Sequence, residues 1–124
     1  MNGANIQSYR DLLVWQQAMD LAVLSYALTR RFPREGLFGL TSQIRRSAAS
    51  VAANIAEGHG RENSGSFIQF LRIAQGSLKE TETHLLLAER IGLLKPVELK
   101  PAMQKCDEIG RMLRSLIRAI QDKQ

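Results

Sequence analysis

Apolar residues recur at intervals of three and four along four stretches of the chain, and this spacing constrains the fold more than any other feature. It is the period of one face of an α-helix, and no stretch shows the alternation typical of a strand. The predicted helices cover about residues 9–31, 40–57, 66–91 and 96–121. Long helices with short connections are typical of antiparallel neighbours. The sequence therefore predicts an all-α fold, an antiparallel up-and-down four-helix bundle that forms a single domain over residues 1–124.

Signals for helix ends agree with these ranges. Ser8 with Asp11 resembles a capping box at the start of the first helix. Pro33 ends that helix, because proline lacks an amide donor and disfavours helical geometry in the residue before it. Gly92 closes the third helix, and the fourth starts near Pro96. The expected apolar rows are Leu12, Trp15, Met19, Ala22 and Tyr26; Leu40, Ile44, Ala48, Val51 and Ile55; Phe67, Leu71, Ala74, Leu78, Thr81, Leu85 and Ala88; and Leu99, Met103, Cys106, Leu113, Ile117 and Ile120.

The stretch VAANIAEGHGRENSGSF, residues 51–67, is rich in glycine and could be a phosphate-binding loop or a turn between helices. A phosphate-binding loop would need a preceding strand and a Gly-Lys-Ser/Thr ending, and the stretch has neither. Gly58 follows the last periodic residue of the second helix, where glycine often ends a helix in left-handed geometry. Ser66 with Gln69 has the pattern of a capping box that opens the third helix. The stretch is therefore predicted to be a helix-to-helix turn.

The second predicted helix carries a polar row beside its apolar row. The residues between the two rows are small, mostly alanine, and Lys and Glu are scarce, although solvated helix faces favour them. Two interpretations remain open: a solvated face, or a buried or interfacial polar seam that pairs with Glu80 or Glu82 of the third helix. The predicted seam and oligomer residues are Gln43, Arg46, Ser50, Asn54, Glu57 and Glu80.

The positive charge is concentrated toward the C-terminus. The formal net charge of +5 favours anionic partners such as nucleic acid. A basic row on the fourth helix could contact phosphates without reading sequence, and a solvated outer face is the alternative. No aromatic residues interleave with these cations, so no base-stacking platform is visible in the sequence. The predicted nucleic-acid contacts are Lys100, Arg111, Arg114 and Arg118.

No group of residues reaches the pattern of a catalytic or metal site. Glu80 and His84, one helical turn apart, offer two ligands where a structural zinc site needs four. His59 lies in the predicted turn with no partner fixed by the sequence, and it is expected to be exposed. Cys106 is the single cysteine, which excludes an intramolecular disulfide, and its place on the apolar row indicates a core residue. The sequence predicts no enzymatic activity, no cofactor and no metal.

The apolar runs and the N-terminal residues indicate the location of the protein. No apolar run approaches the ~20 residues that span a bilayer. The N-terminal sequence MNGANIQSYRD lacks the basic and apolar regions of a signal peptide. We therefore expect a cytoplasmic location and no membrane partner.

Several stretches carry a resemblance to a known family. They are Tyr9–Ala18, Phe32-Pro33 with Glu35, Gly39–Arg46, Ser50–Gly58 and Gln75–Glu80, and the Asn-Ile-Ala-Glu-Gly run is the most specific. These residues resemble the bacterial four-helix-bundle proteins, also called the 23S ribosomal RNA intervening-sequence protein family. The resemblance covers about residues 9–93, and the fourth helix matches only by pattern.

The resemblance implies a four-helix bundle whose members assemble as a ring of five. It also implies kinship with the accessory protein of diversity-generating retroelements, a basic pentameric barrel that binds nucleic acid and a reverse transcriptase. No enzymatic activity is established for the family. Two functions therefore remain open: a homopentamer that binds RNA or DNA through basic surfaces, or a structural or adaptor ring that binds a protein partner and has no nucleic-acid role.

Overall fold

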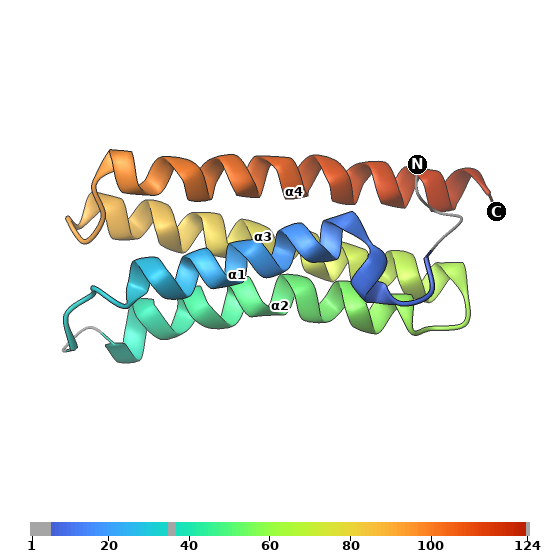
Figure 1. The fold of residues 1–124 in the computed structure, drawn as a ribbon, viewed down its shortest axis with the longest axis horizontal. Coiled ribbons are helices and arrows are strands. Elements are labelled where there is room, and N and C mark those ends of the chain that lie inside the picture. The colour runs from blue at the N-terminus through green and yellow to red at the C-terminus, as the bar shows by residue number, and fades with distance from the viewer. Residues whose placement is uncertain (1–5, 35–36, 124) are drawn as a thin grey trace.

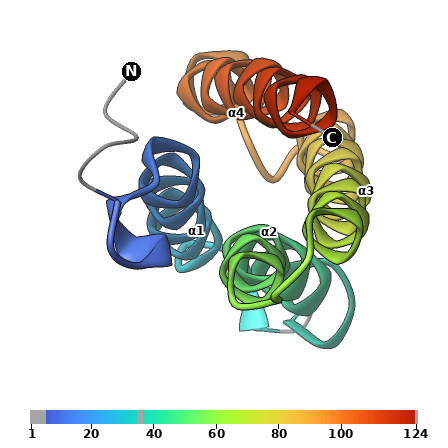
Figure 2. The same cartoon turned by 90° about the vertical axis from the view of Figure 1, so that its right-hand side faces the viewer.

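The protein is a four-helix bundle in the computed structural model, which describes residues 6–34 and 37–123. The helices are α1 (Leu13–Thr29), α2 (Ser42–His59), α3 (Ser64–Arg90) and α4 (Pro96–Asp122). They run antiparallel along one long axis, and each packs against two neighbours, with α1 and α3 at opposite corners (Figures 1 and 2). The predicted fold class is confirmed. Glu35 of the resembling stretches and the first five residues of MNGANIQSYRD lie outside the described residues.

The chain enters the bundle through a short turn that precedes α1. The Ser8 hydroxyl accepts a hydrogen bond from the amide of Arg10, and the Asp11 carboxylate accepts one from the amide of Ser8. This is the expected capping box, but it opens a 3₁₀ turn at Tyr9–Asp11 and not an α-helix. Leu12 is then extended and buried, at 7% exposure. Because burying Leu12 interrupts the helical path, α1 begins at Leu13, later than predicted.

The inward face of α1 differs from the predicted one. Met19 and Tyr26 are 40% and 43% exposed, whereas Trp15 and Ala22 are only partly buried. Leucine, valine and alanine surround most of α1, so the apolar spacing fits more than one face and does not select the buried one. The buried residues of α1 are Val14, Ala18, Leu21, Ser25, Leu28 and Thr29.

The apolar rows of the other three helices face the core as predicted. Leu40, Phe67, Met103 and Ile120, near the ends of these rows, are only partly buried. Full burial of a Leu or Ile side chain contributes about 1.5–3 kcal/mol, so these rows supply the main stabilisation of the bundle. The buried members are Ile44, Ala48, Val51 and Ile55 of α2, Leu71, Ala74, Leu78, Thr81, Leu85 and Ala88 of α3, and Leu99, Cys106, Leu113 and Ile117 of α4, to which the structure adds Ala102 and Ile109.

The glycine-rich stretch is the predicted turn between α2 and α3, but its two boundary signals were assigned wrongly. Gly58 lies inside α2 in helical conformation and is buried, so it does not end the helix in left-handed geometry. The cap of α3 is Asn63, whose Oδ1 accepts a hydrogen bond from the Ser66 amide at 2.8 Å. Asparagine is as good an N-cap as serine, and Asn63 precedes Ser66, so the helix starts at Ser64.

Gly92 ends α3 as predicted. Its φ of +86° is the left-handed conformation that glycine adopts without a steric penalty. The amide of Leu93 donates to the carbonyl of Ala88 at 2.9 Å, which closes the C-terminal turn of the helix. Within residues 6–34 and 37–123, no helix is both long and apolar enough to cross a membrane.

Candidate functional site

The four predicted nucleic-acid contacts all project from the outer side of α4. Lys100, Arg111, Arg114 and Arg118 are exposed. At 100° per residue they fall on one side of the helix, along roughly 27 Å of its axis. None of the four forms an ion pair within the part of the chain that the structure describes. Their charges are therefore available to an external anion.

Carboxylates interrupt this row. Asp107 and Glu108 line a polar hollow of about 530 Å³ together with Lys105 and Arg111. Lys105 forms an ion pair with Glu108 at 3.7 Å. Phosphate contacts would therefore depend mainly on the stretch from Arg111 to Arg118, beyond these two carboxylates.

A polar seam does run between α2 and α3, with partners that the sequence did not indicate. The hydroxyls of Ser50 and Ser77 lie 2.9 Å apart, and Thr81 donates to the Ser47 hydroxyl at 2.9 Å. Asn54 donates to the carbonyl of Ser50 at 2.8 Å and to its hydroxyl at 2.9 Å. The partners on α3 are thus small hydroxyl residues and not Glu80 or Glu82. We call Ser47, Ser50, Asn54, Ser77 and Thr81 the hydroxyl seam.

The remaining residues of the predicted seam lie outside it. Arg46 donates to Gln43 within α2 at 2.8 Å. Glu57 is exposed and pairs with Arg61 at 3.0 Å, and Glu80 is exposed on α3. The helical spacing of these residues does not indicate which of them face the neighbouring helix.

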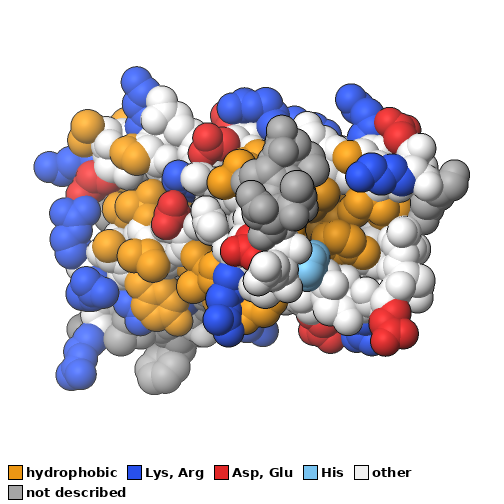
Figure 3. All heavy atoms as spheres, turned by 45° about the vertical axis from the view of Figure 1, so that its right-hand side comes forward, with side chains coloured by type: hydrophobic (Ala, Val, Ile, Leu, Met, Phe, Trp, Pro, Cys, Tyr) orange, Lys and Arg blue, Asp and Glu red, His pale blue; other side chains and the backbone are white. Residues whose placement is uncertain are grey.

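Large apolar side chains are exposed on α1 and α3. A space-filling view shows hydrophobic side chains gathered on the face that includes α1, with Lys and Arg side chains around them (Figure 3). Exposed apolar patches of this kind are typical of protein interfaces. The exposed rows are Met19, Val23 and Tyr26 on α1, and Ile73, Leu86 and Leu87 on α3 with Ile91 directly after it, whereas the exposed Leu13 lies at the cleft between α1 and α4.

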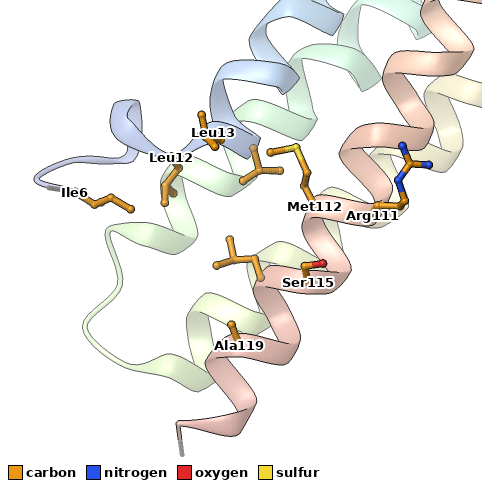
Figure 4. Close-up of a pocket in the computed structure, with 9 residues that line it drawn as sticks. Ile6, Leu12, Leu13, Arg111, Met112, Ser115 and Ala119 are labelled. Atoms are coloured by element: carbon orange, nitrogen blue, oxygen red, sulfur yellow. The ribbon is translucent and has the colours of Figure 1, made fainter. Parts of the chain in front are cut away.

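An apolar cleft of about 320 Å³ separates the start of α1 from the C-terminal half of α4. In Figure 4 side chains from the two segments point toward one another, while the guanidinium of Arg111 points away. The cleft thus lies between α1 and α4, the first and the last of the four helices. It is lined by Ile6, Leu12, Leu13, Val14, Arg111, Met112, Ser115, Leu116 and Ala119.

The histidines and the cysteine do not assemble a reactive centre. Burial raises the pKa of the Cys106 thiol to about 12, so the thiol stays protonated and unreactive at neutral pH. His59 is partly buried and packs edge-on against Phe67, with ring centroids 5.7 Å apart, so it is less exposed than expected. His84 is partly buried, whereas Glu80 is exposed. The described residues contain no cluster of three or more potential metal ligands.

The sequence did not indicate the contact between Arg45 and Tyr26, one of three arginine–aromatic pairs in the described part of the chain. The guanidinium of Arg45 lies over the ring of Tyr26, 4.6 Å from its centroid. The two residues are 19 positions apart, on α1 and α2, so only the packing of these helices brings them together. The sequence shows a Tyr-x-x-Thr order on α1 and an Arg-Arg pair on α2, but nothing in it indicates that these two features contact each other.

Comparisons with known proteins agree with this architecture. A family model described as 23S rRNA-intervening sequence protein matches residues 10–115. A crystal structure from Bacteroides thetaiotaomicron, of a protein with unknown function from the S23 ribosomal protein family, is similar with a TM-score of 0.79 and 28% sequence identity. The match covers 85% of this chain and 98% of that one. No sequence among the curated proteins matches the chain.

Proposed function

Because the chain belongs to the 23S rRNA-intervening sequence protein family, we propose that it is a non-enzymatic bundle that assembles with copies of itself and binds nucleic acid through phosphates. The observation that carries the proposal is the row of exposed cations on α4 without carboxylate partners among the described residues. Such cations attract the phosphate backbone and release its counterions, and they do not read the bases.

Assembly is supported by the two exposed apolar rows. The helices α1 and α3 lie at opposite corners of the bundle (Figure 2), so one copy can present the exposed apolar residues of its α1 to those of α3 in the next copy. A contact between two different patches can repeat from copy to copy. It produces a closed ring when the rotation between successive copies adds up to a full turn. We propose a homopentamer, the number that the family resemblance implies. Five copies with +5 each would carry +25, which strengthens attraction to nucleic acid.

The mass in solution tests the assembly. We expect a pentamer mass by light scattering at micromolar concentration. Val23→Glu on α1 and Leu87→Glu on α3 should each yield smaller species, because each buries a charge in the proposed contact. Val97→Glu is the matched control, since Val97 is exposed on α4 outside both rows. A monomer mass for the parent protein would overturn the assembly.

A salt titration tests nucleic-acid binding. On duplex DNA, log K should fall by ~0.9 for each phosphate contacted per tenfold rise in salt. The triple variant Arg111→Gln, Arg114→Gln, Arg118→Gln should bind more weakly and with a flatter slope. A matched triple variant, with exposed Arg30, Arg72 and Arg90 changed to Gln, removes the same charge elsewhere and should keep the parent slope.

Two results would contradict nucleic-acid binding by the α4 row. One is no binding of labelled RNA or DNA at ~50 mM salt, where phosphate contacts are strongest. The other is the same slope for the parent and the α4 variant. The absence of binding would favour the second candidate function, a structural or adaptor ring that binds a protein partner, and the apolar cleft between α1 and α4 supports that alternative.

A further inference from the structure

A second basic site lies where the end of α1 meets the start of α2. A surface cavity of about 400 Å³ is lined by Tyr26, Thr41, Ser42, Arg45 and Arg46. These described lining residues bring two guanidinium groups and three hydroxyls together and include no carboxylate. The cavity is at the opposite end of the bundle from Arg111–Arg118, because α4 runs away from this end toward the C-terminus (Figure 1).

The Arg45 guanidinium is held in place from two sides. Its Nε donates to the hydroxyl of Thr29 at 2.9 Å, and its Cζ lies over the Tyr26 ring. Thr29 is fully buried, and its hydroxyl donates in turn to the carbonyl of Ser25 at 2.7 Å. Among the described residues only Nε of Arg45 makes a side-chain hydrogen bond, which leaves the two terminal nitrogens for a ligand. A fixed guanidinium with two such nitrogens matches two oxygens of a phosphate.

The other lining residues add donors to the same cavity. Arg46 uses one terminal nitrogen on Gln43 and is otherwise exposed. Ser42 is exposed at the first position of α2. Thr41 is 2% exposed, and its hydroxyl has no hydrogen-bond partner among the described residues. Buried hydroxyls nearly always have a hydrogen-bond partner, so the Thr41 hydroxyl is a candidate to bind a ligand in this cavity.

We propose that this cavity binds a phosphate group, with Arg45 as the bidentate donor and Arg46 and Ser42 as supporting donors. The phosphate can belong to a free nucleotide or to a nucleic-acid backbone. The site does not depend on the α4 row.

Three probes distinguish the sources of the phosphate: inorganic phosphate, a nucleoside monophosphate, and a single-stranded oligonucleotide without terminal phosphates. Binding is measured by calorimetry on the full-length protein. Arg46→Gln and Arg45→Lys should each weaken binding by about tenfold or more, the equivalent of one charge-assisted hydrogen bond. Arg72→Gln, an exposed arginine on α3, removes the same charge as Arg46→Gln and should leave affinity within about twofold.

The outcomes separate this site from the proposed function. If both variants bind the nucleoside monophosphate more weakly than the parent does, the cavity is a nucleotide site. If the variants lose affinity for the oligonucleotide but not for the other two probes, the cavity contacts a nucleic-acid backbone. If no probe binds the parent, or if both variants bind as the parent does, the phosphate site is overturned, even where the α4 row binds nucleic acid. Since Arg46 is exposed, Arg46→Gln still tests the site if Arg45→Lys disturbs the packing on Tyr26.

Discussion

A Cβ atom placed on Gly58 would lie 2.6 Å from the Cβ of Phe70. Real Cβ atoms do not approach so closely, so α2 and α3 touch here at a distance that only glycine permits. The glycine of the Asn-Ile-Ala-Glu-Gly run is thus a packing residue and not a turn residue. Gly58→Ala should push the helices apart and destabilise the fold by about 1–3 kcal/mol, as overpacking does.

Gly76→Ala is the matched control for Gly58→Ala. Gly76 also lies in the interior of a helix, but a Cβ there would meet nothing within 4 Å. The substitution should stabilise the protein by roughly 0.5–1 kcal/mol, since alanine favours the helix. The measurement is the free energy of unfolding in urea. Equal effects of the two substitutions would show that α2 and α3 are not in tight contact at Gly58.

The hydroxyl seam should contribute a measurable coupling between α2 and α3. A double-mutant cycle of Ser50→Ala and Ser77→Ala isolates their hydrogen bond, and we expect a coupling of about 0.5–1.5 kcal/mol. The control pair is Ser50→Ala with Thr83→Ala, because Thr83 is exposed and its hydroxyl donates, among the described residues, to the Lys79 carbonyl of its own helix. A coupling between Ser50 and Ser77 no larger than the control value would contradict the seam.

The small residues of α2 should differ in their tolerance of a larger side chain. Ala52 is 3% exposed and belongs to the core, whereas its neighbour Ala53 is exposed. Ala52→Leu should therefore overpack the core at a cost of about 1–3 kcal/mol. Ala53→Leu should change the unfolding free energy by less than about 0.5 kcal/mol. Thermal unfolding of both variants checks this, and an unchanged Ala52→Leu protein would refute close packing on that side.

The Glu98 carboxylate should make the stability of the bundle depend on pH. The backbone amide of Lys95 and then the Arg31 guanidinium lower the pKa of Glu98. A lowered pKa in the folded state contributes stability above the ordinary carboxyl pKa of about 4.3 and loses it as the pH falls through the lowered value. Glu98→Gln should therefore be less stable than the parent at neutral pH, and the difference should shrink in acid.

The melting temperature as a function of pH checks the role of Glu98. Glu62→Gln is the control, because Glu62 is exposed and forms no ion pair within the described residues. It should melt as the parent does throughout. A difference between the parent and Glu98→Gln that persists unchanged at low pH would point to a cause other than ionisation.

Helix number, order and approximate ends could be predicted from the sequence, because apolar periodicity and Gly92 are local signals. The inward face of α1 could not, because that helix is apolar on most sides and only its neighbours decide which side is buried. The cap at Asn63 was missed because Ser66, three residues later, offers an equally good pattern.

The candidate sites depended more on tertiary contacts than the helices did. The exposure of Lys100, Arg111, Arg114 and Arg118 followed from the helical period alone. The Ser50–Ser77 and Tyr26–Arg45 contacts did not, because each joins two helices whose relative rotation and register the sequence leaves open. Short polar side chains such as serine fit either a solvated face or a tight helix contact, so their role becomes clear only from the neighbour.

The order of the helices along the chain has a consequence for the order of folding. α1 and α2 have 17 and 18 residues, and α3 and α4, which follow them, have 27 each. Successive helices meet through contacts that are local in sequence and form quickly, whereas α1 and α4 must meet across most of the chain. That junction includes the Arg31–Glu98 ion pair and the apolar cleft. We expect it to close last during folding and to open first when the native protein fluctuates.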